Sequence, residues 1–425
     1  MAQENQHAHL PPALRTLTLR IAYANLFDAR DVRRGSGTWY FLGQELERQG
    51  HTVHFLQPGE VELPVATRIF KGLSRRQGSG YRTFQDPLFA RRLGRSLGPS
   101  LAGLDYDFLL TSDYGLAAYC PTERPVVLYT DSMISKEPAK RTNPRLAGLS
   151  PLSTAFSLRT IGAGLAKAAI SIFPGRWQMR EALAYDPDLA QRLAVVPFGA
   201  NVDDPGAELS RTRSVTDLPK GSTGKTRLDL LFLGKDWLGK GGPLAVECCR
   251  VLRRQGYEAV LHAAGGEPQG VSQASLQGPS QGQSPDRSQD ESVVYYGLLD
   301  KNRPKDLARL GELFAKCQLL VLPTAAEGFG LAFAEAAAHG LPVITHDTDG
   351  VNEIVLHEET GLLLPLGSSA IDFADAVTGL VKTPDLYRHL ARASRRRYEE
   401  NWTWKIATER LLLEIESRLP REGTL

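Results

Sequence analysis

Two carboxylates eight positions apart, Glu327 and Glu335, stand where this chain could do its most specific chemistry. The segment around them, Ala325 to Pro342, reads AAEGFGLAFAEAAAHGLP and has a glycine on each side of Phe329. This pattern predicts a strand, a glycine loop and a helix whose first turn presents unpaired amides to an anion such as a diphosphate. Glu335 can accept hydrogen bonds from a vicinal diol such as a ribose, and Glu327 can reach a second polyol. The residue types therefore suit a sugar nucleotide.

Two lysines in a second loop can supply positive charge to the same anion. The apolar run Arg227 to Gly234 predicts a strand, and GKDWLGKGG follows it, with Lys235 at the strand end and Lys240 before a helix. A charge-assisted hydrogen bond contributes about 1.5 to 3 kcal/mol and an exposed helix end roughly 0.3 to 1 kcal/mol. The lysines should therefore dominate if both converge on one phosphate pocket. Two ordinary surface lysines beside a turn are the alternative.

A third loop lies near the N-terminus, between a strand expected over Leu17 to Ala24 and a helix expected from about Trp39 to Gln49. Together with the strand His51 to Leu56, these elements form a βαβ opening. The loop contains Gly35, Ser36, Gly37 and Thr38. Because GSGT lacks the full dinucleotide fingerprint, the motif alone does not separate a binding loop from an ordinary βα turn.

The glutamate motif and the segments after it resemble the donor-site signature of glycosyltransferase family 4. Seven residues separate Glu327 from Glu335, and the matching segments continue with AAAHGLPVI at 336–344 and DGVNEIVLHEETGLLLP at 349–365. Members of this family are retaining enzymes. The resemblance implies an α/β protein of the GT-B architecture, in which two Rossmann-like domains face each other across a cleft.

The resemblance also implies roles for single residues. Glu335 would bind the ribose, Glu327 would bind hydroxyls of the donor sugar, and Lys235 and Lys240 would contact the diphosphate. Arg is frequent in the family where this chain has Lys235, and a lysine still supplies a point charge. The glycine loop would bind the sugar and diphosphate through Gly328, Phe329, Gly330 and Leu331.

Three further candidates follow from the same resemblance. In related transferases the loop at 35–38 reaches over the cleft to the donor phosphate and the acceptor. Gly297, in the run YYGLL, resembles the part of the family near the nucleobase. Asp131 ends the run VVLYTD, about where many relatives have a histidine that faces the cleft. We list Asp131 as a candidate catalytic residue, and a polar strand end without a catalytic role is the alternative.

The pattern of apolar runs predicts two domains. Residues 1–204 would form an acceptor-side Rossmann-like domain, residues 205–226 a linker, and residues 227–400 the donor domain. Strands are expected at 108–110, 126–129, 168–173 and 193–196 in the first domain. Residues 267–292 are of low complexity and are expected to form a disordered insertion. In GT-B proteins a C-terminal helix crosses back to the first domain, and residues 401–425 would be that helix.

Composition agrees with a large enzyme. The chain has 425 residues, of which 42% are hydrophobic and 23% charged, and this length suits two domains. Its four cysteines include no CxxC pair, which argues against a zinc site or a disulfide framework. The net charge of +2 implies no general attraction to nucleic acid. We expect no cofactor and no required metal, because lysines and helix ends can neutralise the diphosphate.

The N-terminal sequence lacks the unbroken apolar segment of a secretory signal, so we expect a cytoplasmic protein. Residues Arg68 to Arg95 carry many arginines, with Phe89, Leu93 and Leu97 at helical spacing. This region could contact an anionic membrane at its cytosolic face or hold a phosphorylated acceptor. A solvated arginine face on an ordinary helix explains the same residues and is the preferred interpretation.

The sequence thus predicts a retaining glycosyltransferase that moves a sugar from a nucleoside-diphosphate sugar to an acceptor hydroxyl. The acceptor could be a glycan, a lipid-linked molecule or a small molecule. Front-face transfer would need no enzyme nucleophile, so positioning and electrostatics would supply the rate. A sugar-nucleotide 2-epimerase of the same architecture and a non-catalytic glycan-binding protein are the alternatives.

Overall fold

The computed structural model describes residues 18–138, 141, 144–216, 218–266, 292–348 and 350–419. The insertion expected at 267–292 lies outside these residues except for Ser292, and so does Asp349 of the family-like segment.

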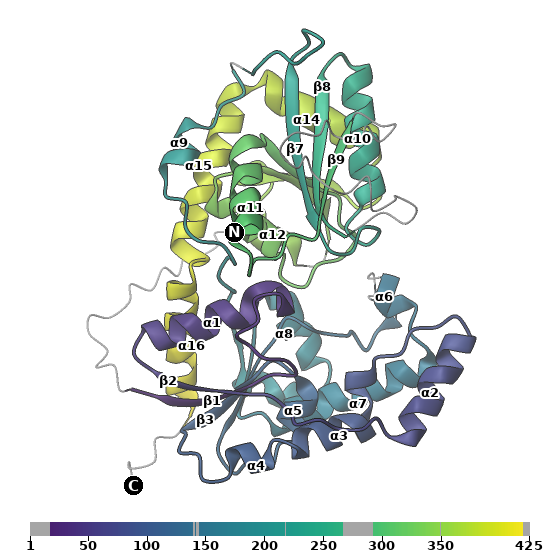
Figure 1. The fold of residues 1–425 in the computed structure, drawn as a ribbon, viewed down its shortest axis with the longest axis vertical. Coiled ribbons are helices and arrows are strands. Elements are labelled where there is room, and N and C mark those ends of the chain that lie inside the picture. The colour runs from purple at the N-terminus through teal and green to yellow at the C-terminus, as the bar shows by residue number, and fades with distance from the viewer. Residues whose placement is uncertain are drawn as a thin grey trace.

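Two parallel six-stranded sheets form the two halves of the molecule, one above the other in Figure 1. The first sheet has the order β2-β1-β3-β4-β5-β6 and the second the order β12-β11-β10-β7-β8-β9. The strands of the first sheet are β1 (Arg20–Ala24), β2 (Thr52–Leu56), β3 (Phe108–Thr111), β4 (Val126–Tyr129), β5 (Ile170–Phe173) and β6 (Leu193–Val195). Those of the second are β7 (Arg227–Gly234), β8 (Glu258–Gly265), β9 (Val293–Gly297), β10 (Leu319–Leu322), β11 (Val343–Asp347) and β12 (Gly361–Pro365). The predicted fold class is confirmed.

The strand order fixes where a ligand can bind. In the first sheet the chain changes direction between β1 and β3, and in the second between β7 and β10. In open parallel sheets, the loops that leave the carboxyl ends of strands at such a switch point diverge and leave a crevice. The loops after β1, β7 and β10 are the three that carry the predicted glycines, lysines and glutamates.

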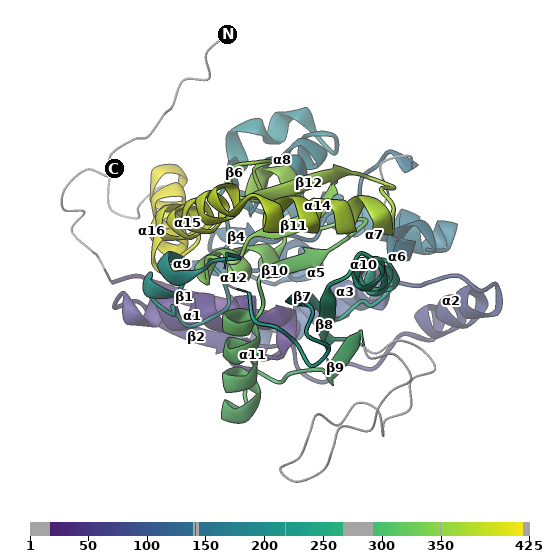
Figure 2. The same ribbon diagram turned by 90° about the horizontal axis from the view of Figure 1, so that it is seen from above.

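Helices cover both sheets. In the first domain, α3 (Pro87–Arg95), α5 (Tyr114–Tyr119) and α7 (Pro151–Lys167) pack on one another, and α1 (Thr38–Arg48) packs on α16 (Trp404–Arg418). In the second, α10 (Gly242–Arg254) packs on α14 (Ala370–Lys382), and α12 (Leu331–Ala338) packs on α15 (Pro384–Asn401). The other helices are α2 (Val65–Arg76), α4 (Gly98–Leu101), α6 (Pro144–Ala147), α8 (Arg176–Leu183), α9 (Glu208–Thr212), α11 (Pro304–Lys316) and α13 (Val351–Ile354). In both ribbon views, α2 stands at the outer edge of the first domain (Figures 1 and 2).

Alternate residues of β1 show how the first sheet is buried on both faces. Ile21 and Tyr23 belong to a core that continues into the second domain. Ala22 and Ala24 belong to a separate core beneath α3, α5 and α7. Period-two alternation sends successive side chains to opposite faces, and a strand covered on both sides is therefore apolar throughout.

The end of the chain packs on the first domain. α15 and α16 run beside both halves in Figure 1. The backbone N–H of Ala200 donates to Trp402 O at 2.8 Å, and the ring of Trp404 stacks on Phe198 at 6.2 Å. These contacts agree with the expectation that residues 401–425 pack on the first domain. The domain limits at 204, 226 and 400 stay a prediction. In the part of the chain that the structure describes, no helix combines the length and the apolar character needed to cross a bilayer.

Candidate active site

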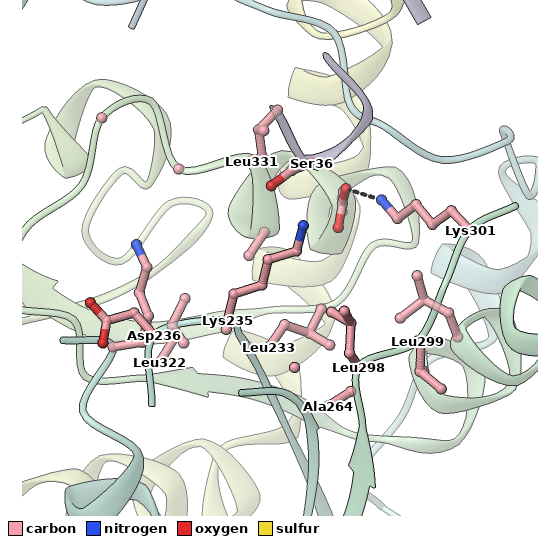
Figure 3. Close-up of a pocket in the computed structure, with 18 of the residues that line it drawn as sticks. Ser36, Leu233, Lys235, Asp236, Ala264, Leu298, Leu299, Lys301, Leu322 and Leu331 are labelled. Carbon is pink, nitrogen blue, oxygen red and sulfur yellow. Dashed lines mark hydrogen bonds and ion pairs between the residues drawn. The ribbon is translucent and has the colours of Figure 1, made fainter. Parts of the chain in front are cut away.

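A cavity of about 440 Å³ opens between the two domains at the carboxyl ends of β7 and β10 (Figure 3). Most of the residues predicted from the sequence line it, and they come from both domains. They are Ser36, Asp131, Lys235, Lys240, Glu327, Gly328, Phe329, Gly330, Leu331 and Glu335. The structure therefore brings together the carboxylates and ammoniums that the motifs singled out.

Lys240 and Glu327 form an ion pair at the base of the glycine loop. The ammonium Nζ lies 2.6 Å from Glu327 Oε1, and the carboxylate is largely buried. The loop that holds Lys240 lies close to β10, since Gly241 has a φ of 75° and a Cβ there would lie 2.1 Å from the carbonyl oxygen of Pro323. Only glycine fits that conformation and that space. The lysine is thus fixed beside the predicted sugar-binding carboxylate.

Glu335 is paired with a lysine that the sequence analysis did not single out. Lys301, between β9 and α11, places its Nζ 2.7 Å from Glu335 Oε1, the contact drawn in Figure 3. The same ammonium donates to the backbone carbonyl of Asn201 at 2.7 Å. Glu335 itself is buried in α12. An ionised carboxylate at this depth needs such a partner, and Lys301 supplies it.

Asn201 holds three parts of the site together from a fully buried position. Its side-chain amide donates to Ser36 O and Thr38 Oγ1, both at 3.1 Å. Its Oδ1 accepts from Trp404 Nε1 at 3.0 Å. Through its carbonyl it also holds Lys301. The loop of the first domain, the C-terminal helix and the Glu335 pair are therefore positioned by one residue.

Lys235 extends into the middle of the cavity. Figure 3 shows its ammonium pointing toward Ser36 of the first domain. The Nζ atom donates to the backbone carbonyl of Arg33 at 3.2 Å. Although the side chain is exposed to the cavity, the surrounding protein removes enough water to lower the pKa of the ammonium, and the charge of Lys301 lowers that pKa further. An anion in the cavity would oppose both effects, because an opposite charge nearby raises the pKa of an ammonium.

One side of the cavity is apolar. Figure 3 shows Leu233, Ala264 and Leu298 on the side away from the ammonium of Lys235. Leu299, Leu310 and Leu322 also line the cavity. An apolar wall next to a charged one matches a ligand with a flat, weakly polar end and an anionic centre.

Four predicted residues do not line this cavity. Gly35 lines a second cavity in the first domain, Gly37 and Thr38 are buried, and Gly297 precedes the lining residue Leu298. Ser36 does line the site, with a φ of 58° that non-glycine residues rarely adopt. The loop is thus a strained turn that presents one hydroxyl, rather than a run of four contacting residues.

The glycine loop of the second domain docks on the first domain. The ring of Phe329 packs edge-to-face on Phe198, with 5.6 Å between centroids. The carbonyl of Gly328 accepts from Trp177 Nε1 at 3.0 Å and from Gln178 Nε2 at 2.8 Å. Both donors belong to α8. The relative position of the domains therefore controls the shape of the predicted sugar-binding loop.

Asp131 lies where the donor cavity meets the second cavity, and lines both. Burial raises the pKa of its carboxyl, and the charge of Glu327 raises it further, while Lys240 opposes the change. The folded chain therefore binds the proton of Asp131 more tightly than the unfolded chain does. The protonated carboxyl adds to the free energy of unfolding below the ordinary pKa of 3.8, and this contribution is lost as the pH rises through the raised pKa.

Replacing Asp131 with asparagine is therefore expected to stabilise the protein at neutral pH. The free energy of unfolding should rise by more than the ~0.5 kcal/mol typical of a surface substitution, and the gain should disappear at about pH 3. Urea unfolding at both pH values measures this. Asp188→Asn, at an exposed aspartate, is the matched control. Equal stability of Asp131→Asn and the parent chain at pH 7 would contradict the electrostatic assignment.

Comparison with known proteins agrees with this geometry. Residues 227–383 match the family model described as glycosyl transferases group 1. A D-inositol 3-phosphate glycosyltransferase of Rhodococcus erythropolis is 37% identical over 109 residues, 26% of this chain and 24% of that protein. A GDP-mannose-dependent alpha-(1-6)-phosphatidylinositol monomannoside mannosyltransferase of Mycobacterium tuberculosis is 28% identical over 64% of this chain and 67% of that protein. The chain thus matches about a quarter of the length of the first curated relatives, 24% for each of three.

Solved structures match over nearly the whole chain. Sucrose-phosphate synthase from Thermosynechococcus elongatus superimposes with a TM-score of 0.65 at 17% identity, covering 94% of this chain and 99% of that one. Anabaena HepE in complex with UDP and glucose gives a TM-score of 0.59 at 13% identity, covering 94% and 100%. At these identities the likeness concerns the fold, and the predicted family resemblance is confirmed by the domain match. Residues 227–383 thus match the group 1 glycosyltransferases, and the chain as a whole has the GT-B fold.

Proposed function

We propose that this protein is a retaining glycosyltransferase that moves a sugar from a nucleoside-diphosphate sugar to an acceptor hydroxyl, without a required metal. One observation carries the proposal. Two ammoniums, Lys235 and Lys240, and two carboxylates, Glu327 and Glu335, line a single cavity at the carboxyl ends of facing parallel sheets. The ammoniums suit a diphosphate and the carboxylates suit the hydroxyls of a ribose and a hexose.

In the proposed reaction the bond between the anomeric carbon and the diphosphate oxygen breaks, and the acceptor oxygen forms its bond on the same face. The acceptor proton passes to the departing phosphate oxygen. Lys235 and Lys240 would stabilise the negative charge that grows on the leaving group. Glu327 would orient the donor sugar, Glu335 the ribose, and the apolar wall would receive the base.

The names of the relatives support a nucleotide-sugar donor. One curated relative is named as GDP-mannose-dependent, and one solved structure of the same fold holds UDP and glucose. The base and the sugar that this chain uses can be identified directly. Incubation with UDP-, GDP- and ADP-sugars, followed by chromatography of the products, is the direct test.

Without an acceptor, a transferase should slowly hydrolyse its donor to free sugar and nucleoside diphosphate. With the correct acceptor it should form a glycoside that keeps the anomeric configuration of the donor. Conversion of the donor into an isomeric sugar nucleotide would instead identify an epimerase. Saturable binding of glycans without any turnover would identify a binding protein.

We further propose that the first domain docks on an anionic membrane, at the cytosolic face, through α2. Val65, Ile69 and Leu73 are 68%, 54% and 48% exposed and recur every four residues on one face of this helix. Exposed basic residues flank that stripe at Arg68, Lys71, Arg75 and Arg76. An apolar stripe bordered by cations is the pattern of a helix that lies in a membrane interface. Phe89, Leu93 and Leu97, by contrast, are buried core residues and cannot take part.

Replacing Ile69 with aspartate is expected to weaken binding to anionic vesicles by about tenfold or more, since one buried aliphatic side chain contributes about 1.5 to 3 kcal/mol. Co-sedimentation with phosphatidylserine-containing and neutral vesicles measures this. Ile371→Asp, at a residue that is 58% exposed on α14 of the other domain, is the matched control and should bind as the parent does. Negligible retention of the parent chain on both vesicle types would remove the membrane proposal.

A further inference from the structure

A second cavity of about 530 Å³ lies in the first domain, next to the donor cavity. Asp131 lines both cavities, so the two spaces meet at that carboxyl. Gly35 of the N-terminal loop lines the second cavity as well. A molecule bound there would lie beside the donor sugar, within the range of volumes that hold small-molecule ligands.

The wall of this cavity contains Arg82, which forms no ion pair with an acidic side chain among the residues that the structure describes. Arg82 is partly buried, and its guanidinium donates one hydrogen bond, from Nη2 to Ser132 Oγ at 3.3 Å. No carboxylate in the described part of the chain forms an ion pair with it, although Asp113 acts on its charge from beyond ion-pair distance. A guanidinium has five N–H donors, and buried charges are almost always paired. Arg82 therefore has unused capacity to bind an anion.

The segment that carries Arg82 is held firmly in place. Its backbone N–H donates to Ser153 Oγ of α7 at 2.9 Å, and the 3-10 turn Thr83–Gln85 follows directly. The carbonyl of Gln85 accepts from Thr160 Oγ1 at 2.9 Å. An arginine fixed in this way loses little conformational freedom when it binds a ligand.

Besides Asp131, two carboxylates line this cavity, Asp28 and Asp113, and each has another contact. Asp28 forms a two-pronged pair with Arg30, with both N–O distances at 3.0 Å. Asp113 caps the N-terminus of α5 by accepting from the N–H of Leu116 at 2.9 Å. Asp28 is thus neutralised by Arg30, and Asp113 is held by the helix that it caps. Neither carboxylate forms an ion pair with Arg82.

The remaining wall suits the ring of a polyol. Phe27 and Phe84 are both exposed and lie edge-to-face, 5.8 Å apart. A second guanidinium, Arg34, stacks on Phe27 with 4.4 Å between its Cζ and the ring centroid. The cavity thus combines apolar ring faces, a fixed cation within and a second cation beside them.

We propose that this cavity holds the acceptor, and that the acceptor is a small polyol bearing an anionic group, a phosphate monoester or a carboxylate, bound by Arg82. Its reacting hydroxyl lies toward Asp131 and the donor sugar. The inference rests on the proposed transferase function, because it names the substrate class of that reaction. The chemistry of the bond transfer is unchanged: the acceptor oxygen gains the anomeric carbon, and its proton leaves with the diphosphate.

The test separates the two cavities. A calorimetric titration with UDP, GDP and ADP first identifies the nucleoside diphosphate that fills the donor cavity. With that nucleoside diphosphate present at saturation, the chain is titrated with inorganic phosphate and, separately, with acetate. We expect phosphate or acetate to bind, and Arg82→Gln to weaken that binding at least tenfold. Arg82→Lys, which keeps the charge, should retain part of it, and Arg95→Gln, at an exposed arginine of α3, should match the parent.

A turnover assay then ranks acceptors with the parent chain. Glucose 6-phosphate, glucuronate and glucose are compared, together with glycerol 3-phosphate and glycerol. An anionic acceptor should accelerate release of the nucleoside diphosphate at least tenfold more than the corresponding neutral acceptor. Comparison of the phosphorylated acceptors with glucuronate tells which anion is preferred. Equal anion binding by Arg82→Gln and the parent, no anion binding by the parent, or equal use of neutral and anionic acceptors would overturn the proposal. If no nucleoside diphosphate binds, the transferase function fails instead, and the phosphate titration still reports on Arg82.

Discussion

Replacing Lys240 with alanine is expected to lower kcat for sugar transfer by about 100-fold, the effect of losing one donor that stabilises charge in a transition state. The lysine lies 2.6 Å from Glu327 and lines the cavity with Lys235. Its removal takes away a cation from the leaving diphosphate and also leaves a largely buried carboxylate unpaired. Both consequences disfavour a leaving group that becomes more negative.

Initial-rate kinetics at saturating donor and acceptor measure this effect. Lys240→Arg keeps the charge and should retain more activity than the alanine variant, though a guanidinium differs in shape from an ammonium. Lys382→Ala, at an exposed lysine that ends α14, should stay within about twofold of the parent. If Lys240→Ala folds normally and keeps more than about a third of kcat, Lys240 has no part in stabilising the leaving group.

The second large effect is expected at Glu335, in donor binding. Glu335→Gln keeps the size of the side chain and removes its charge. A hydrogen bond to a charged group contributes about 1.5 to 3 kcal/mol, which corresponds to donor binding weakened by about 10- to 100-fold. Titration with the nucleoside diphosphate isolates this affinity from turnover. Glu312→Gln, at an exposed glutamate of α11, is the matched control.

Lys301 gives this prediction a second readout. If Lys301 acts on the donor only by holding Glu335, the double variant Glu335→Gln with Lys301→Ala should lose little more affinity than Glu335→Gln alone. Fully additive losses would mean that the lysine contacts the donor independently. Unchanged affinity in Glu335→Gln would remove the ribose-binding role altogether.

The site residues that the sequence predicted are those set by local pattern. Lys235, Lys240 and Glu327 lie in loops that follow a parallel strand, and Glu335 lies in the helix after β10. The strand order then brings these chain positions to one edge. Because loops at the carboxyl ends of parallel strands share one side of the sheet, local motifs could predict a common cavity. The pattern of apolar runs predicted strands of both sheets, whereas the helix at the end of the chain was expected from the family resemblance.

The partners of those residues could not be predicted in the same way. Lys301 lies in DKNRP, which has no glycine or strand pattern of its own. It reaches Glu335 of α12 from the connection between β9 and α11, a contact between segments far apart in the sequence. A lysine four positions after a strand was the available signal. Asn201 belongs to the other domain, so the contact between its carbonyl and Lys301 depends on how the two domains pack together.

In the basic region at 68–95, the sequence pattern did not predict the environment of each arginine. Its arginines have three different environments: those of α2 are exposed beside apolar residues, Arg82 lines a cavity, and Arg91 lies over the ring of Tyr119 at 5.3 Å. The helical spacing of Phe89, Leu93 and Leu97 marks a core face, as helical apolar spacing usually does. These environments depend on tertiary packing, so the composition of the region could not predict them.

A crystal structure of the chain with its tightest-binding nucleoside diphosphate tests the central claim most directly. Our account predicts the diphosphate within hydrogen-bonding distance of both Lys235 Nζ and Lys240 Nζ. It predicts the ribose hydroxyls on the carboxylate of Glu335 and the base against Leu298. A nucleotide that binds elsewhere, or that lies in this cavity with its phosphates away from both lysines, would contradict it.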